Sequence, residues 1–283
     1  MSCLTVKDYS LIVRIIILCI LISIVSVIIV EDYSYNISAD ISLSSDNIRQ
    51  MDLSDIDISM LFTMSEELSL SPGELLCLFH ICNLPVNQKT TYKKSMVYRL
   101  RNRMIRSYGK EYGELVTFYE ALLSDVKYFP VPESICTDKW VSYVNSWNYE
   151  RTYGGVRPHE GTDIMADINE RGRYPVVSVC DGVVEKMGWL EKGGWRIGIR
   201  SNNGVYFYYA HLHSYADIKE GDTVKAGEII GFMGDSGYSV VEGTVGKFDV
   251  HLHFGIYYGE EETSYNPYWI IKYLENNILY YDY

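Results

Sequence analysis

The sequence predicts an α+β chain made of an N-terminal transmembrane helix, a small helical module and a mainly antiparallel β domain. Three observations lead to this fold class: a nearly uncharged segment close to the N-terminus, a middle region with helical periodicity, and a second half of short strands separated by glycine- and asparagine-containing turns. These patterns predict boundaries at 1–9 for an N-terminal tail, 10–30 for the transmembrane helix, 31–47 for a linker, 48–128 for the helical module and 129–283 for the β domain.

The segment Ser10–Val30 predicts a single-pass membrane anchor. Its 21 residues contain one charge, Arg14, and a helix of that length at about 1.5 Å per residue spans a bilayer. Basic residues lie on its N-terminal side and two acidic residues follow it, so the positive-inside rule places residues 1–9 in the cytoplasm and the rest of the chain outside the cell membrane. A cleaved signal peptide is the alternative, but the uncharged run Ile15–Val30 is long for one and no Ala-x-Ala-like cleavage site follows.

The module after the polar, Ser- and Asp-rich linker is predicted to be helical. The run Ser71–Glu74 reads Ser-Pro-Gly-Glu, a capping-box pattern with proline at the first helical position, and an apolar stretch follows it up to Cys82. Two further helices are expected over Thr91–Ser107 and Lys110–Asp125. His80 lies within the apolar stretch and is expected to be packed in a helix rather than to act in a site.

A group of basic side chains lies between residues 93 and 110 of this otherwise acidic chain. A solvated helix face is the simpler interpretation, and anionic lipid headgroups or teichoic acids are the alternative ligands. The sequence does not fix what the helical module does, and a cell-envelope protein is its candidate partner.

Beyond Phe129–Pro132 the helical period gives way to short strands. The clearest hairpin runs from Trp195 to His211, with Ser201–Gly204 as its turn region. Four more strands complete an antiparallel β core, predicted at Val176–Val179, Val183–Met187, Ile229–Met233 and Val250–Tyr257.

Five residues of the β domain form the candidate site: His159, Asp163, His211, His251 and His253. Two imidazoles and one carboxylate from such a group suit a tetrahedral zinc ion and leave its fourth position open for water, as in catalytic rather than structural zinc sites. Histidines that do not bind the metal have an unperturbed pKa of about 6.5, so they can exchange protons near neutral pH.

The spacing of these residues fits extended chain. Side chains two apart on a strand point to the same face, so His251 and His253 can act side by side. His159 and Asp163 are also an even number apart, and the glycine and β-branched threonine between them argue against a helix.

Four motifs occur together in the second half of the chain: His159-x-x-x-Asp163, Tyr209-Ala210-His211-Leu212, His251-Leu252-His253-Phe254, and Gly-Asp-x-Val-x-x-Gly at Gly221–Gly227. With them, the sequence from Trp147 to Ile271 resembles the M23 family of zinc metallopeptidases, the lysostaphin-like enzymes that cut peptide cross-links in bacterial cell walls.

The resemblance implies one Zn²⁺ per chain, held by His159, Asp163 and His253, with His211 and His251 placed around the bound water and the scissile carbonyl. It implies a metallopeptidase domain over residues 129–283 and peptidoglycan peptides as its binding partners. The family assigns no role to the neighbouring histidine at position 213, which is expected to lie outside the site.

The implied function is a zinc-dependent endopeptidase that hydrolyses peptide cross-links or stem peptides of bacterial peptidoglycan through a zinc-activated water. His251 is the expected general base, while His211 is expected to bind the developing oxyanion or to protonate the leaving amine; these two roles could be exchanged. Because all five chemical positions are kept, hydrolysis is favoured over a non-enzymatic envelope scaffold or activator of a division or sporulation complex that reuses the fold.

Composition and charge exclude other classes. With 47% hydrophobic and 22% charged residues the chain is globular rather than disordered, and its net charge of −12 argues against nucleic acid as a partner. The run Glu220–Gly227 also resembles a motif of lipoyl- or biotinyl-carrier domains, but such carriers present a lysine on a hairpin turn and Asn202–Gly204 has none.

Overall fold

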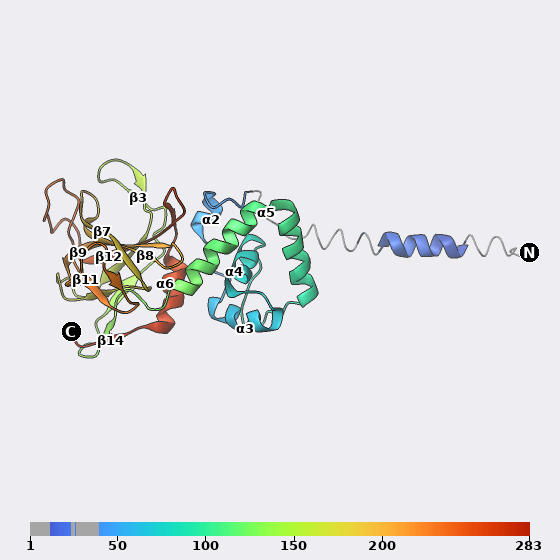
Figure 1. Ribbon diagram of the computed structural model, residues 1–283, viewed down its shortest axis with the longest axis horizontal. Helices are drawn as coiled ribbons and strands as arrows, with labels where there is room; N and C mark the ends of the chain where they lie inside the picture. The colour runs from blue at the N-terminus through green and yellow to red at the C-terminus, as the bar shows by residue number, and fades with distance from the viewer. Residues whose placement is uncertain (1–11, 24–25, 27–39) are drawn as a thin grey trace, which may run out of the picture. The chain divides into compact units, whose positions relative to one another are not determined.

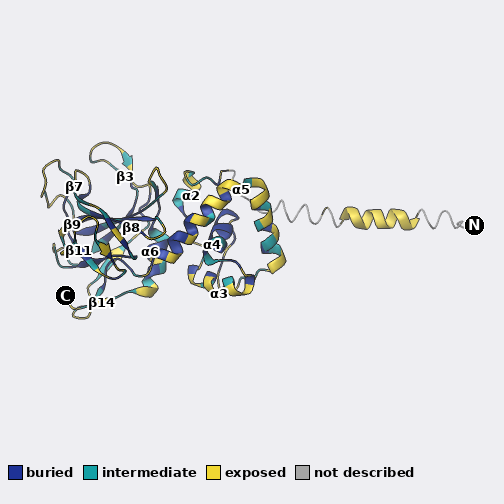
Figure 2. Ribbon diagram, viewed as in Figure 1, coloured by how far each residue is buried: buried dark blue, intermediate teal, exposed yellow. Residues whose placement is uncertain are grey.

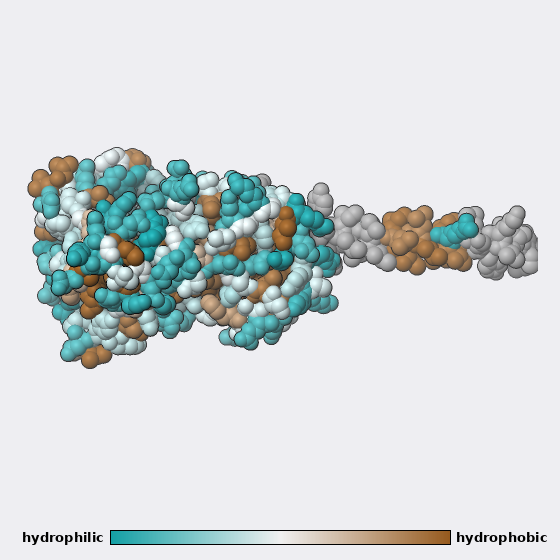
Figure 3. Space-filling view, in the orientation of Figure 1, coloured by the Kyte–Doolittle hydropathy of each residue, from teal (hydrophilic) through white to brown (hydrophobic). Residues whose placement is uncertain are grey.

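The computed structural model describes residues 12–23, 26 and 40–283 (Figure 1). Contacts divide the chain into two compact units, Met1–Ser38 and Ala39–Tyr283. In the first unit, residues 12–23 form a helix whose surface is mostly apolar (Figure 3). Within the described ranges, every helix falls short of the length or the hydropathy that a bilayer crossing needs. The predicted anchor at 10–30 and the predicted tail at 1–9 lie partly or wholly outside the described residues.

The second unit begins with a helical part in which α4 is the centre. Its helices are α2 (Asp46–Gln50), α3 (Ile58–Leu68), α4 (Pro72–Ile81) and α5 (Lys94–Asp125). As the capping-box pattern predicts, Pro72 is at the start of α4 and the Ser71 hydroxyl accepts a hydrogen bond from the Glu74 backbone N–H at 3.1 Å. Helix α4 packs against both α3 and α5, and most of its side chains are therefore buried (Figure 2).

Helix α5 joins the two segments that the sequence predicts as separate helices. The element is continuous from Lys94 to Asp125, but Tyr108 leaves the helical region with φ −141° and ψ 35°. This kink falls where the prediction placed the break between the two helices. Gly109 follows directly, and glycine lowers helix stability by roughly 1 kcal/mol relative to alanine.

The β domain is built on one antiparallel sheet of 10 strands, which confirms the predicted architecture. Its main path runs in the order β10, β7, β8, β9, β12, β5, β2, while β11 pairs with β6 and β9, and β13 pairs with β12. The strands are β2 (Val141–Tyr143), β5 (Thr162–Ala166), β6 (Pro175–Val177), β7 (Gly182–Leu190), β8 (Gly194–Ser201), β9 (Tyr206–Tyr215), β10 (Thr223–Val224), β11 (Ile229–Met233), β12 (His251–Tyr258) and β13 (Thr263–Tyr265). The expected hairpin is the pair β8 and β9.

Short elements complete the domain at its edges. Strand β1 (Glu133–Ser134) pairs in parallel with β14 (Tyr280–Tyr281), and β3 (Glu150–Arg151) pairs with β4 (Arg157–Pro158). Helix α6 (Tyr268–Leu274) and the 3₁₀ turn η1 (Glu275–Asn277) follow β13.

The helical part and the β domain share one core. Phe118 of α5 stacks on Tyr265 of β13 with ring centroids 4.3 Å apart. At the end of α5, the buried Asp125 carboxylate accepts a hydrogen bond of 2.6 Å from the Ser201 hydroxyl. Ile41 is also buried, at 2% exposure, although it falls in the range predicted as linker. Ile41, near the end of the predicted linker, is therefore packed in the core of this unit.

His80 is a core residue of α4, as its apolar surroundings predict, and it makes folding stability depend on pH. Its Nδ1 lies 2.7 Å from the Tyr119 hydroxyl, and burial lowers the pKa of His80 to about 4.

The unfolded chain protonates His80 near pH 6.5. Acidification from pH 6.5 to pH 4 therefore stabilises the unfolded state and lowers the free energy of unfolding. Between pH 7 and pH 5, we expect the native chain to lose about 2 kcal/mol more unfolding free energy than a His80→Gln variant. Urea denaturation at both pH values tests this, and equal losses would contradict it.

Candidate metal centre

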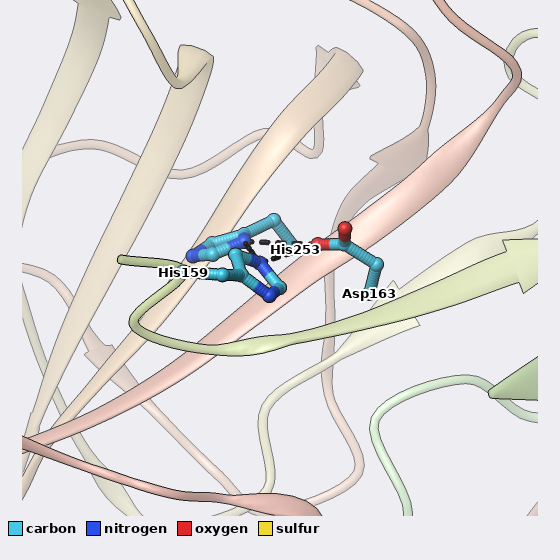
Figure 4. A group of neighbouring side chains, drawn as sticks. All are labelled: His159, Asp163 and His253. Carbon is cyan, nitrogen blue, oxygen red and sulfur yellow. Dashed lines mark hydrogen bonds and ion pairs between the residues drawn. The ribbon is translucent and has the colours of Figure 1, made fainter. Parts of the chain in front are cut away.

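Three side chains bring one ligand atom each to a common point in the β domain. His159 lies just before β5, Asp163 lies on β5, and His253 on the adjacent strand β12 is directly opposite Asp163 in the strand register. Nε2 of His159 is 2.9 Å from Nδ1 of His253, and each of these nitrogens is 3.0 Å from Oδ1 of Asp163 (Figure 4). The structure thus gathers the three residues that the family resemblance implies as metal ligands.

This donor set fits a zinc ion. Two imidazole nitrogens and one carboxylate oxygen are ligands of catalytic zinc sites, which bind the metal through three protein groups. Zinc bonds of about 2.0–2.1 Å in a tetrahedron separate the ligand atoms by roughly 3.3 Å, and the 2.9–3.0 Å spacings here are within a few tenths of an ångström of that value. Small side-chain shifts would therefore be enough to accommodate the ion.

Neighbouring groups fix the orientation of two ligands. Nδ1 of His159 lies 3.0 Å from the backbone carbonyl oxygen of Ser146, which can only accept a hydrogen bond, so that nitrogen carries the proton. Its Nε2 lone pair is then free to bind a metal. Arg151 of β3 forms an ion pair with Oδ2 of Asp163, which leaves Oδ1 directed at the two histidines. Neither Ser146 nor Arg151 was found from the sequence.

Gly161 is required by the close approach of His253. A Cβ atom at position 161 would lie 2.5 Å from Cε1 of His253 and 2.8 Å from the backbone oxygen of Phe254. Only hydrogen fits in this space, because the strand backbone cannot yield as a flexible side chain would. This accounts for the glycine between His159 and Asp163 in steric terms.

A Gly161→Ala substitution is therefore expected to displace the His253 ring and weaken zinc binding by about 10- to 100-fold. Competition with a chromogenic chelator measures the affinity. Gly113→Ala is the matched control, because a Cβ at this position in α5 would meet nothing within 4 Å. Unchanged zinc affinity in Gly161→Ala would contradict the steric explanation.

The other two histidines of the predicted site lie beside the ligand group. The ring centroids of His211 and His251 are 4.7 Å apart, and Nε2 of His251 is 3.9 Å from Oδ1 of Asp163. His211 has a left-handed backbone conformation, with φ 63°, where the pairing of β9 with β8 shifts register. Such a conformation is costly for a residue with a Cβ and is found most often at functional sites. His213 is exposed and lies outside this group.

Backbone carbonyls set the tautomers of both histidines. Nδ1 of His211 is 2.7 Å from the carbonyl oxygen of Ser236, and Nδ1 of His251 is 2.7 Å from that of Asp249. In each neutral ring Nδ1 therefore donates, and Nε2 is left as a proton acceptor. The contact of His251 is with the backbone oxygen of Asp249, whereas the Asp249 carboxylate accepts a hydrogen bond of 2.9 Å from Asn169.

Burial lowers the pKa of His211, His251 and His253, whereas hydrogen bonds lower the pKa of the Asp163 carboxyl group. Burial takes the pKa of His211 well below its usual value, and the neighbouring His251 and His253 add to this effect. Burial also lowers the pKa of His251, although the negative charge of Asp163 opposes the shift. For Asp163 burial works in the opposite direction, but hydrogen bonds from His159 and His253 outweigh it and lower the pKa of the carboxyl group. The centre thus combines an anionic ligand with imidazoles that can accept protons at pH 7.

All five residues line a cleft of about 610 Å³. Tyrosines form part of its wall: Tyr206 and Tyr208 of β9 and Tyr257 of β12 face the cleft, whereas Phe207 and Tyr209 are fully buried on the opposite face of β9. The alternation follows from the period of two along a strand. It separates core aromatics from those available to a ligand.

An arginine from the helical part supports the turn that carries His159. Nη2 of Arg49, in α2, donates to Oε1 of Glu160 at 2.6 Å, and the Ser264 hydroxyl donates to the same oxygen at 2.8 Å. The helical part therefore contributes directly to the position of the first predicted metal ligand.

Comparison with known proteins agrees with this geometry. The family model Peptidase family M23 matches residues 157–267. The chain is 50% identical over 143 residues to the L-Ala--D-Glu endopeptidase of Bacillus subtilis, covering 50% of this chain and 41% of that protein. It is 38% identical over 117 residues to lysostaphin of Staphylococcus simulans, covering 38% of this chain and 21% of that protein. The chain thus spans less than half the length of these curated relatives.

A solved structure extends the likeness beyond the β domain. A crystal structure from Ruminococcus gnavus, described as a candidate glycyl-glycine endopeptidase lytM, is 44% identical with a TM-score of 0.68. The match covers 85% of this chain and 95% of that one, so it includes helical residues as well as the sheet. On the family match, the sequence identities and this shared fold, the chain belongs to peptidase family M23.

Proposed function

We propose that this chain is a zinc-dependent endopeptidase that hydrolyses peptide cross-links or stem peptides of bacterial peptidoglycan. The observation that carries the proposal is the convergence of His159, Asp163 and His253 on one point, with two neutral imidazoles beside them in an open cleft. The names of the relatives, L-Ala--D-Glu endopeptidase and lysostaphin, support a wall peptide as the substrate.

A zinc ion held by these three residues would supply an acidified water as the nucleophile. His251 presents the lone pair of Nε2 toward the ligand group and accepts the proton of the attacking water. Nε2 of His211 is also a proton acceptor in the neutral ring. Once protonated, it can donate to the developing oxyanion or to the leaving amine. The two histidines could exchange these roles, because both rings have the same tautomer.

Digestion of purified cell wall and of defined wall fragments, with products identified by mass spectrometry, tests the proposal. We expect about one zinc per chain and release of peptide fragments that stops when the metal is chelated. A stable, zinc-free protein that releases nothing would instead support the non-enzymatic alternative, an envelope scaffold or activator of a division or sporulation complex.

We propose further that residues 10–30 anchor the protein in the cell membrane, with residues 1–9 in the cytoplasm and the peptidase domain outside. The support is the 21-residue segment with a single charge and the distribution of charges on either side of it. N-terminal sequencing of the mature protein tests the anchor, and a start at residue 31 or later would rule it out.

A further inference from the structure

Two arginines of the cleft differ from the paired arginines of the compact unit. Nη1 of Arg196 and Nε of Arg157 are buried, and neither atom has a hydrogen-bond partner among the residues that the structure describes. Other arginines form ion pairs with carboxylates, among them Arg49, Arg101, Arg151, Arg171, Arg173 and Arg200, although Nε of Arg173 is also buried without a partner among the described residues. Since a buried N–H group without a partner is costly and uncommon, these two atoms call for a ligand.

Both arginines line the cleft that contains the candidate metal centre. Arg196 of β8 and Tyr208 of β9 both line the cleft, and the β8 residue opposite Tyr208 in the strand register is Gly198, two positions from Arg196. The ring of Tyr208 is 6.0 Å from that of His253, which connects the arginine to the metal centre through a single tyrosine.

Three of the four carboxylates that line the cleft pair with other arginines, and the fourth, Glu191, accepts a hydrogen bond of 3.4 Å from the Tyr153 hydroxyl. Glu160 is held by Arg49 at 2.6 Å, and Glu262 is held by Arg200 at 2.9 Å. Each of these carboxylates thus pairs with an arginine other than the two in the cleft wall. Among the described residues, Arg157 and Arg196 therefore form no ion pair with a carboxylate, in a protein whose net charge is −12.

We propose that Arg196, together with Arg157, binds a carboxylate of the substrate peptide, so that the preferred substrate has an acidic residue next to the scissile bond rather than an uncharged glycine bridge. A guanidinium matches a carboxylate through parallel N–H donors, and the partly buried tyrosine wall strengthens the pairing by excluding water. This inference rests on the proposed peptidase function and specifies the substrate class of the same cleft.

Binding to an inactive, zinc-loaded full-length His251→Ala chain tests the proposal without turnover. The probes are two synthetic L-alanyl-D-glutamyl peptides that are identical except that the glutamyl carboxyl group outside the backbone is free in one and amidated in the other. Calorimetry is expected to give about 10- to 100-fold tighter binding of the acid peptide. Adding Arg196→Gln should remove most of this preference, whereas adding Lys186→Gln, an exposed cation of the same cleft, should leave it.

Three outcomes would overturn the proposal. The two peptides could bind equally, or the acid peptide could fail to bind at millimolar concentration. Arg196→Gln could also weaken the binding of both peptides by the same factor. Arg196→Lys is a second variant that keeps the charge and should retain part of the preference, so a folding defect can be distinguished from a lost ligand contact.

Turnover by the unsubstituted chain separates this inference from the proposed function. Digestion of cell wall with no preference between the two peptides would leave the peptidase function standing and remove the carboxylate site. If the chain binds the acid peptide through Arg196 but hydrolyses neither cell wall nor peptide, the carboxylate site stands and the peptidase function is ruled out.

Discussion

Replacing His251 by alanine is expected to lower kcat by about 10²- to 10⁴-fold while the protein keeps its zinc. Loss of a positioned general base typically costs this much, and His251 is not one of the three residues whose ligand atoms converge. Its Nε2 nevertheless lies 3.9 Å from Oδ1 of Asp163, close enough to serve a water bound at the metal. Initial rates on a defined wall peptide, measured beside the zinc content of the same preparation, give both quantities.

His213→Ala is the matched control for this experiment, because His213 is exposed and two residues from His211 on the same strand. It should retain the parental rate. A His251→Ala enzyme that hydrolyses at the parental rate would remove His251 from the mechanism. If His211→Ala lowers kcat more than His251→Ala does, His211 is the general base and His251 takes the other role.

Replacing His159 by alanine is expected to remove the zinc itself and, with it, measurable hydrolysis. His159 is 2% exposed and its Nε2 is within 3.0 Å of both other ligand atoms, so its loss leaves only two protein ligands. Catalytic zinc sites use three. Zinc per chain after dialysis, determined by inductively coupled plasma mass spectrometry, should fall from about one to near zero.

Partial rescue distinguishes this result from misfolding. A correctly folded His159→Ala chain should keep the far-UV circular dichroism of the parent and should recover some zinc at high metal concentration. A variant that retains stoichiometric zinc after dialysis would mean that His159 is not a ligand.

The sequence predicts the β architecture well because the signals there are local. Strand β11 has the predicted ends, and the turn at Ser201–Gly204 joins β8 to β9 as its residue types indicate. The alternation in Tyr206–Tyr209 likewise separates the cleft face from the core face. Such patterns depend on the period of a strand and on turn preferences, which neighbouring residues determine.

The sequence also predicts which residues make up the candidate centre, since its imidazoles and carboxylate occur in short, recognisable motifs. The groups that orient these side chains are not. Ser146 and Ser236 act on His159 and His211 through backbone carbonyl oxygens, which any residue could supply. Arg151 reaches Asp163 from the short hairpin of β3 and β4, and no local pattern encodes that contact.

The contact between the helical part and the site could not be predicted either, because no local sequence pattern encodes it. Arg49 belongs to a five-residue helix that begins within the predicted linker, yet it holds Glu160 at 2.6 Å across 111 positions of sequence. Tertiary packing sets such pairs, and the charge pattern of a single sequence does not reveal them. The fold therefore ties the helical residues to the turn that carries His159.

The most direct test of the account is a crystal structure of the protein grown with zinc, with diffraction data collected on both sides of the zinc absorption edge. We expect one anomalous peak per chain, bound by Nε2 of His159, Oδ1 of Asp163 and Nδ1 of His253, with bonds of about 2.0–2.2 Å. A peak held by other residues, or the absence of a peak at these three side chains under saturating zinc, would contradict it.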